Sequence, residues 1–144
     1  MQLYSESADL AAAAGGGKRW RRVAEAVAAA PGLPAGPAFS IGDSLTYRHG
    51  TGAVLGTDDL VGRRRYQFVV AALDGDVLVE VAQKTALTAT APYSDLTDRQ
   101  RFSGPATLVT VPRGGLLVVD IDEAARILPE SEADAVLLHV TIED

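Results

Sequence analysis

The chain of 144 residues contains no cysteine and only two histidines, His49 and His139. Without cysteine it cannot form disulfides or thiolate metal sites, which fits the reducing cytoplasm, the location we expect. Two histidines are too few for a histidine-rich metal site. The N-terminal residues lack the basic and apolar regions of a cleaved signal peptide. No apolar run approaches the roughly 20 residues that a membrane-spanning helix needs, so we expect no membrane partner.

Positive charge is also scarce, because 13 lysines and arginines face 19 acidic residues and the formal net charge is -6. This balance argues against nucleic-acid binding, which needs a basic face. The basic residues gather in two clusters, Lys18–Arg22 and Arg63–Arg65. The second cluster lies at the mouth of the apolar run Phe68–Leu73. A guanidinium stays charged and needs anionic or carbonyl partners when buried, so these arginines are either solvated or drawn into a site.

Hydrophobic residues make up 47% of the chain, enough for one domain with a buried core. Helical composition covers Ala8–Ala14 and Arg19–Ala30, the second segment with an apolar face of Trp20, Val23, Ala24 and Val27. Three glycines separate the two segments, and the proline-rich residues 31–37 end the second. We therefore predict a helical segment over residues 1–37 that packs on a barrel of residues 38–144.

Beyond residue 38 the chain changes to short β-rich segments separated by Gly, Asp and Pro. The predicted strands are Phe39–Ile41, Ser44–Arg48, Tyr66–Leu73, Val77–Ala82, Thr107–Val111, Leu116–Ile121 and Ala135–Ile142. Asp74-Gly75 and Arg113–Gly115 predict tight hairpin turns. Many short strands with close turns favour a sandwich or a small barrel. The strand Tyr66–Leu73 is apolar on both faces, so either helices or another chain must cover it.

Three short motifs carry no chemistry on their own. Gly15–Lys18 lacks the Ser or Thr and the preceding strand of a phosphate-binding loop. Ser40–Ser44 lacks the strand-turn-helix context of a nucleophilic serine. His139 lies inside an apolar strand pattern, where we expect a side chain that faces solvent or is satisfied by a neighbour.

The segment Ser40–Arg48 resembles a signature of the YhcH/YjgK/YiaL family, which includes the small, β subunit of the evolved β-galactosidase. The resemblance continues in order through Gly17–Trp20, Arg64–Tyr66, Tyr93–Arg99, Asp120–Ala124 and Val140–Asp144, which is nearly the whole chain. It implies a mainly β fold, a cupin-like jelly roll with N-terminal helices whose two sheets enclose a pocket. It also implies either an accessory chain of a large glycoside-hydrolase subunit or a free sugar-binding protein with anomerase activity.

Relatives in this family commonly hold a metal at positions that match Arg63, Phe68, Val70 and Asp122 in this sequence. Only Asp122 is still a possible ligand, whereas a transition metal needs three or four N, S or carboxylate donors. We therefore predict that the metal site is lost and that the chain uses no cofactor. Arg63 and Asp122 pair inside the barrel if both point inward. Otherwise Arg63 lies at the rim in water and Asp122 accepts a hydrogen bond within a turn.

Several matched residues keep polar chemistry suited to sugars. Anomerisation needs a proton donor and an acceptor near the anomeric centre, and sugar hydroxyls bind planar polar groups beside an aromatic wall. The candidate catalytic residues are Arg65, Glu80 and Asp122, and the candidate substrate-binding residues are Arg48, Arg63, Tyr66, Lys84, Asp95 and Arg99. Each also has a structural interpretation, with Glu80 as an exposed strand residue and Asp95 in a loop salt bridge with Asp98 and Arg99.

Two functions remain open on these residues. The leading hypothesis is a non-catalytic, carbohydrate-related accessory subunit that docks on a large glycoside-hydrolase subunit, because the metal donors are missing. The alternative is a metal-independent sugar anomerase or isomerase that acts on a free sugar or sugar acid. A sugar-sensing or structural homo-oligomer is a third possibility.

Overall fold

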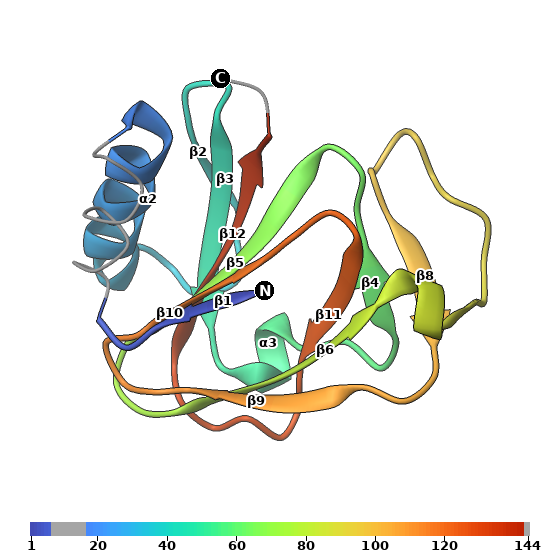
Figure 1. The fold of residues 1–144 in the computed structure, drawn as a ribbon. Coiled ribbons are helices and arrows are strands. Elements are labelled where there is room, and N and C mark those ends of the chain that lie inside the picture. Colours follow the sequence, from blue (N-terminus) through green and yellow to red (C-terminus); the bar gives the residue numbers. More distant parts are fainter. Residues whose placement is uncertain (7–16, 143–144) are drawn as a thin grey trace.

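The computed structural model describes residues 1–6 and 17–142, which form two six-stranded antiparallel sheets (Figure 1). Sheet A contains, in spatial order, β1 (Gln2–Tyr4), β10 (Leu116–Val119), β5 (Tyr66–Ala72), β12 (Ala135–Thr141), β3 (Leu45–Gly50) and β2 (Phe39–Ile41). Sheet B contains β7 (Thr88–Ala89), β8 (Gln100–Ser103), β4 (Leu60–Gly62), β11 (Glu123–Ile127), β6 (Val77–Gln83) and β9 (Thr107–Val111). The mainly β class expected from the sequence is confirmed.

The order of the strands identifies the architecture. Sheet A has the central order β10-β5-β12-β3 and sheet B the order β9-β6-β11-β4, and β10, β5 and β12 pack across a shared core on β9, β6 and β11. Along the chain these strands alternate between the sheets, except for the step from β6 to β9 within sheet B. This is the connectivity of a double-sheet jelly roll, the architecture of cupins. The fold is therefore cupin-like.

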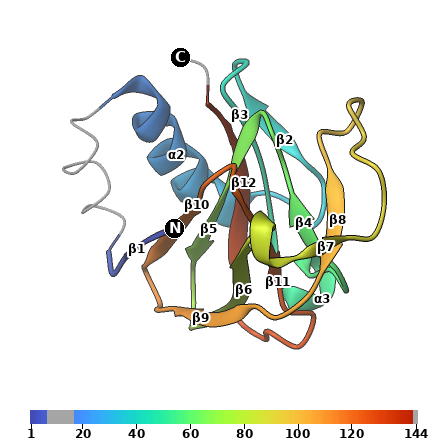
Figure 2. The same ribbon diagram turned by 45° about the vertical axis from the view of Figure 1, so that its right-hand side comes forward.

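Strand β5 is apolar on both faces because each face is covered within the chain. Val70 and Ala72 point between the sheets, where they join valines of sheet B. Val69 and Ala71 point the other way and pack with Val23 of the helix α2 (Lys18–Ala29). Figure 2 shows this helix alongside the outer face of sheet A. Burial on both sides explains a strand without alternation.

The N-terminal segment matches the prediction in part. Helix α2 continues into the short 3-10 turn η1 (Ala30–Gly32), and Val23, Ala26 and Ala30 are its fully buried side chains. Ala24, which we placed on the buried face, is exposed, because Ala26 follows Val23 at the spacing that faces sheet A. Residues 2–4 form the edge strand β1 on β10 and are not helical. The predicted helix Ala8–Ala14 lies outside the described residues.

Both predicted hairpins are wrong. The turn at Asp74-Gly75 joins β5 of sheet A to β6 of sheet B, and the turn at Arg113–Gly115 joins β9 of sheet B to β10 of sheet A. Each is a corner between sheets, because β5 already has β10 and β12 as neighbours. The two corners contact each other, since the amide of Arg113 donates to Asp76 at 3.2 Å.

Two short helical turns complete the chain, α3 (Gly52–Leu55) and η2 (Lys84–Ala86). Gly52 lies against the backbone of the loop before β12, where an added Cβ would stand 2.2 Å from the carbonyl oxygen of Leu128. Its amide donates to the carbonyl of Ser131 at 2.8 Å, so α3 is fixed at the closed end of the core. No described helix is long and apolar enough to span a membrane.

Candidate functional site

A cavity of about 240 Å3 lies between the two sheets. Sheet A contributes alternate residues of its inner face, among them Arg48 of β3 and His139 of β12. Leu137 pairs with Arg48 and belongs to the core between the sheets, which places Arg48 on the same inner face. The apolar part of the wall consists of Ala38, Leu55, Val61, Phe68, Ala125, Ile127 and Leu137.

The polar part of the wall is strongly basic. Its polar side chains are those of Arg48, Thr57, Arg63, Arg99 and His139, with no carboxylate among the described lining residues. Arg126 also borders the cavity, but it alternates with the inward-facing Ala125 and Ile127, so its guanidinium points outward. The chain is acidic overall, but the wall of this cavity is positively charged. Such a cavity attracts anions, because its low-dielectric walls strengthen the field of the arginines.

Within residues 1–6 and 17–142, Arg126 is the one arginine bordering the cavity that has a carboxylate partner. Its guanidinium lies 2.6 Å from Glu80 Oε1 in an ion pair across β11 and β6, and it also donates to the carbonyl of Thr57 at 2.8 Å. Glu80, a candidate catalytic residue, is thus held by Arg126. On β6 it also alternates with the inward-facing Val79 and Val81, which points it away from the core between the sheets.

Arg48 and Arg63 have only carbonyl partners in the part of the chain that the structure describes. Arg48 Nη2 donates to the carbonyl of Val54 at 3.1 Å, and Arg63 Nη1 makes long bonds of 3.4 and 3.3 Å to the carbonyls of Thr97 and Asp98. The Nε atoms of Arg48 and Arg63 are buried without a hydrogen-bond partner. A buried donor without a partner is costly, and an oxygen-rich ligand in the cavity would satisfy both.

The arginines act on one another and on His139. Burial, followed by the charge of Arg99, lowers the pKa of Arg63 to about 10, which still leaves it cationic at neutral pH. Desolvation lowers the pKa of His139 to about 3, with further contributions from Arg63, Arg48 and Arg99. His139 packs edge-on against Phe68 with 6.4 Å between ring centroids. It is therefore a neutral imidazole in the cavity wall, and the expectation that it faces solvent is wrong.

Acid is expected to destabilise the protein through His139. An unfolded histidine takes up a proton below its ordinary pKa of 6.5, whereas His139 in the folded chain stays neutral down to about 3. The free energy of unfolding should fall as pH drops through this interval, by at most about 1.4 kcal/mol per pH unit. Urea unfolding at about pH 7 and about pH 5 measures it. The variant His139→Asn should lose this part of the pH dependence, and an unchanged slope in the variant would contradict the assignment.

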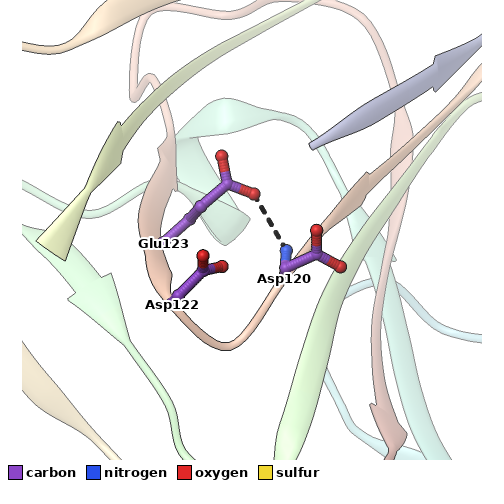
Figure 3. A group of neighbouring side chains, drawn as sticks. All are labelled: Asp120, Asp122 and Glu123. Carbon is purple, nitrogen blue, oxygen red and sulfur yellow. Dashed lines mark hydrogen bonds between the residues drawn. The ribbon is translucent and has the colours of Figure 1, made fainter.

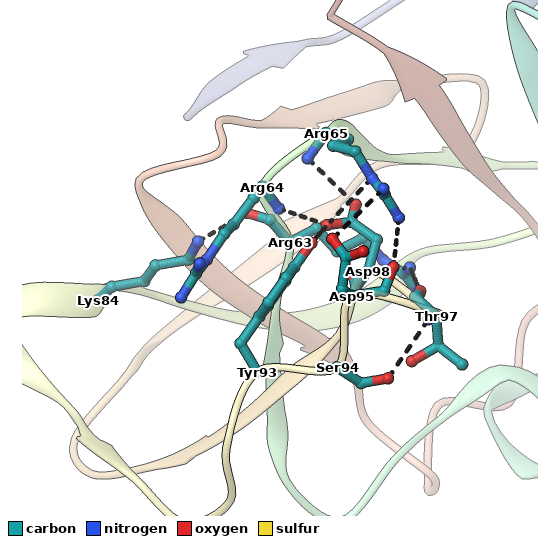
Figure 4. A network of polar contacts seen from close by, with 9 residues as sticks. All are labelled: Arg63, Arg64, Arg65, Lys84, Tyr93, Ser94, Asp95, Thr97 and Asp98. Carbon is teal, nitrogen blue, oxygen red and sulfur yellow. Dashed lines mark hydrogen bonds and ion pairs between the residues drawn. The ribbon is translucent and has the colours of Figure 1, made fainter.

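A buried carboxylate organises the arginine run at the rim of the cavity (Figure 4). Asp98 is 2% exposed, and its backbone φ is +52°. Its carboxylate accepts bonds from the amides of Arg64 and Arg65 at 2.9 and 3.1 Å and from the hydroxyl of Tyr93. Burial alone would raise the pKa of Asp98, but these bonds outweigh it and lower the pKa. Sequence reasoning placed Asp98 only in a loop salt bridge.

The remaining rim residues hold the backbone and the loop in place. Arg65 donates to the carbonyl of Asp95 at 2.7 Å and forms an ion pair with its carboxylate at 3.6 Å. Lys84 donates to the carbonyl of Arg63 at 2.6 Å, and burial followed by Arg64 lowers its pKa. Arg64 lies over the ring of Tyr93 at 3.9 Å. Arg65, Lys84 and Asp95 therefore position the loop around the cavity.

The structure brings only some of the predicted site residues together. Arg48, Arg63 and Arg99 line the cavity, while Arg65 and Tyr66 line a second pocket next to it. Glu80, Lys84 and Asp95 have the partners given above, and Asp122 is exposed between β10 and β11. Within the described residues Arg63 and Asp122 form no ion pair, because Arg63 turns to the loop carbonyls and Asp122 lies outside the cavity.

The donor set does not fit a metal in this cavity. Among the described lining residues only the imidazole of His139 is a suitable ligand, and Val70 is fully buried in the core. A separate acidic group, Asp120, Asp122 and Glu123, has carboxylate oxygens within 4.8 Å of one another (Figure 3). None of the three lines the cavity, and Glu123 lies 2.7 Å from the amino group of Met1. This group already has a cationic partner.

Comparison with known proteins gives similarity of fold only. No protein-family model matches the chain. Protein NMB1881 from Neisseria meningitidis aligns over 83% of this chain and 96% of its own, with 16% identity and a TM-score of 0.41. YcfD from E. coli aligns over 79% of this chain and 28% of its own, with 15% identity and a TM-score of 0.48. A cupin protein from Bacteroides fragilis, BF4112, aligns over 78% of this chain and 89% of its own, with 10% identity and a TM-score of 0.39. The cupin-like assignment therefore rests on the strand order.

Proposed function

We propose that this chain is a non-catalytic, carbohydrate-related protein that binds an acidic sugar in its inter-sheet cavity without a metal. The observation that carries this proposal is the cavity wall, where Arg48, Arg63 and Arg99 face no lining carboxylate and two Nε donors lack partners. A sugar carboxylate supplies a planar, bidentate acceptor for a guanidinium. The absence of competing carboxylates in the wall favours an acid over a neutral sugar.

The resemblance to the YhcH/YjgK/YiaL family supports a biological role for this binding. We propose that the chain is an accessory subunit similar to the β subunit of the evolved β-galactosidase, which assembles with a large glycoside-hydrolase subunit. Glu80 and Asp122, two of the three candidate catalytic residues, do not line the cavity, which supports a binding role. Co-expression with a large hydrolase subunit encoded nearby, followed by size-exclusion chromatography, tests this role. Co-elution supports it, and separate elution contradicts it.

A metal-independent anomerase is the second candidate, and His139 favours it. Its imidazole lies in the cavity beside Arg63 and is neutral, so it can accept a proton, but a pKa of about 3 makes it a weak base. Exchange NMR between the anomers of glucuronate, with and without micromolar protein, decides between the two. Acceleration that is lost in His139→Asn supports the anomerase, whereas unchanged exchange rates support a binding function.

Thermal unfolding tests the ligand class itself. Glucuronate and galacturonate should raise the melting temperature, because a ligand that binds only the folded state stabilises it by about 2.7 kcal/mol at a hundredfold excess over Kd. Glucose and galactose, which lack the carboxylate, should leave it unchanged. Equal stabilisation by the neutral sugars would contradict the proposed preference for acids.

A further inference from the structure

A second pocket, also of about 240 Å3, adjoins the inter-sheet cavity. The two share Arg63 and His139 as lining residues. Its other lining residues are Thr46, Arg65, Tyr66, Leu96, Thr97 and Asp98. We call it the outer pocket, because it lies toward the end of sheet A where the arginine run and its loop form the rim.

The strand register makes the two pockets successive parts of one trough. Along β12, Leu137 lines the cavity, His139 lines both pockets, and Thr141 pairs with Tyr66 of the outer pocket. Alternate residues of a strand share a face, so Tyr66 continues the inner face on which Phe68 lies. Arg63 stands at the junction with only long bonds of 3.3 and 3.4 Å to the loop. A ligand in the cavity therefore extends naturally toward Tyr66.

The two parts differ in charge. The cavity wall has several arginines and no carboxylate, whereas the outer pocket contains the carboxylate of Asp98 beside Arg63 and Arg65. Arg65 is further matched by Asp95. Apart from Arg63 and His139, which it shares with the cavity, and the matched charges of Arg65 and Asp98, the outer pocket is lined by neutral groups: two threonines, Leu96 and the ring of Tyr66. An aromatic face beside hydroxyl groups suits a neutral sugar ring.

Leu96 completes the outer pocket from the loop. It is 94% exposed, so its side chain has almost no packing within the chain. The loop that presents it is nevertheless fixed, because Ser94 and Arg99 exchange backbone bonds of 2.8 and 3.2 Å and Asp98 binds the amides of the arginine run. A leucine held in this way gains burial only when a ligand covers it.

We infer that the ligand is an acidic disaccharide, with its uronate ring in the cavity and a neutral second ring in the outer pocket against Tyr66 and Leu96. This inference rests on the proposed function, because it takes the uronate in the cavity as given. Neither pocket alone has the volume of about 300 Å3 or more that is usual for ligand sites, whereas the joined trough reaches it. The outer pocket is thus the part that sets ligand length.

Calorimetric titration of glucuronate and of glucuronosyl-glucose tests this inference. The wild type should bind the disaccharide about tenfold more tightly than glucuronate. Leu96→Ser should weaken disaccharide binding about fivefold and leave glucuronate binding unchanged, because only the neutral ring reaches the loop. The matched control is Leu108→Ser, which replaces another exposed leucine, one on β9 that lines neither pocket.

The possible outcomes separate the two proposals. Equal affinity of the wild type for both ligands, or an equal loss for both in Leu96→Ser, overturns the disaccharide inference and leaves the acidic-sugar function standing. An effect of Leu108→Ser as large as that of Leu96→Ser also overturns it. If neither uronate binds at millimolar concentration, the proposed function itself is overturned.

Discussion

Replacing Asp98 with alanine is expected to lower the free energy of unfolding by about 3 kcal/mol. Its carboxylate is buried and accepts the amides of Arg64 and Arg65 as well as the hydroxyl of Tyr93. The substitution leaves these donors without an acceptor and removes the anchor of the loop. Urea unfolding followed by tryptophan fluorescence, with Trp20 as the single tryptophan, measures the change.

The control for this prediction is Asp95→Ala, which removes a carboxylate from the same loop. Asp95 is an exposed partner of Arg65, and exposed ion pairs contribute at most about 1 kcal/mol. A loss in Asp98→Ala no larger than that in Asp95→Ala would show that Asp98 does not anchor the loop.

The stabilisation from Asp98 also depends on pH. Because the pKa of Asp98 is held below its ordinary value of 3.8, its contribution is complete above that value and is lost as the folded carboxylate takes up a proton. The stability difference between the wild type and Asp98→Asn should therefore shrink below about pH 4. His139 is present in both proteins, so the difference between them isolates the contribution of Asp98.

Replacing Arg63 with glutamine is expected to weaken glucuronate binding about thirtyfold, the equivalent of one lost charge-assisted contact of about 2 kcal/mol. Arg63 lines both pockets and carries one of the two buried Nε donors in the cavity wall that lack a hydrogen-bond partner. Titration calorimetry measures the affinity. The matched control is Arg113→Gln, which makes the same change of net charge on an exposed corner turn.

The same substitution should not lower the stability of the free protein. Burial, followed by repulsion from Arg99, lowers the pKa of Arg63, and its Nε lacks a partner. Removing Arg63 therefore removes a repulsion between like charges and an unpaired buried donor. Such unfavourable terms in the free protein are common at sites selected for binding. A large loss of stability together with unchanged affinity would mean that Arg63 is structural.

The parts of the fold that follow local rules could be predicted from the sequence. Strands β2 and β9 were predicted with their observed bounds, because alternating β-branched and aromatic residues lie between turn signals. Strand β11 was missed because its sequence, Glu-Ala-Ala-Arg-Ile, has helical composition. It is a strand because it lies between β4 and β6, where its alanines are buried. Tertiary packing outweighs local propensity there.

The residues of the candidate site also differ in whether the sequence alone could identify them. Arg48, Arg63 and Arg99 could be proposed because a guanidinium in an acidic chain needs a partner or a ligand. His139 could not be assigned to the cavity, because its face depends on the register with Phe68 across two strands. The ion pair between Glu80 and Arg126 could not be predicted either. The two residues are far apart in the sequence, and the pairing of β6 with β11 places them opposite each other. The amino-acid sequence alone does not show which strands pair with one another.

The central claim is that the cavity binds an acidic sugar through arginines and without a metal. Titration calorimetry of the wild type with glucuronate and with glucose, before and after dialysis against a chelator, tests it most directly. We expect one glucuronate bound per chain, no binding of glucose, and the same affinity for glucuronate after chelation. Binding of glucose with equal affinity, or loss of glucuronate binding after chelation, would contradict it.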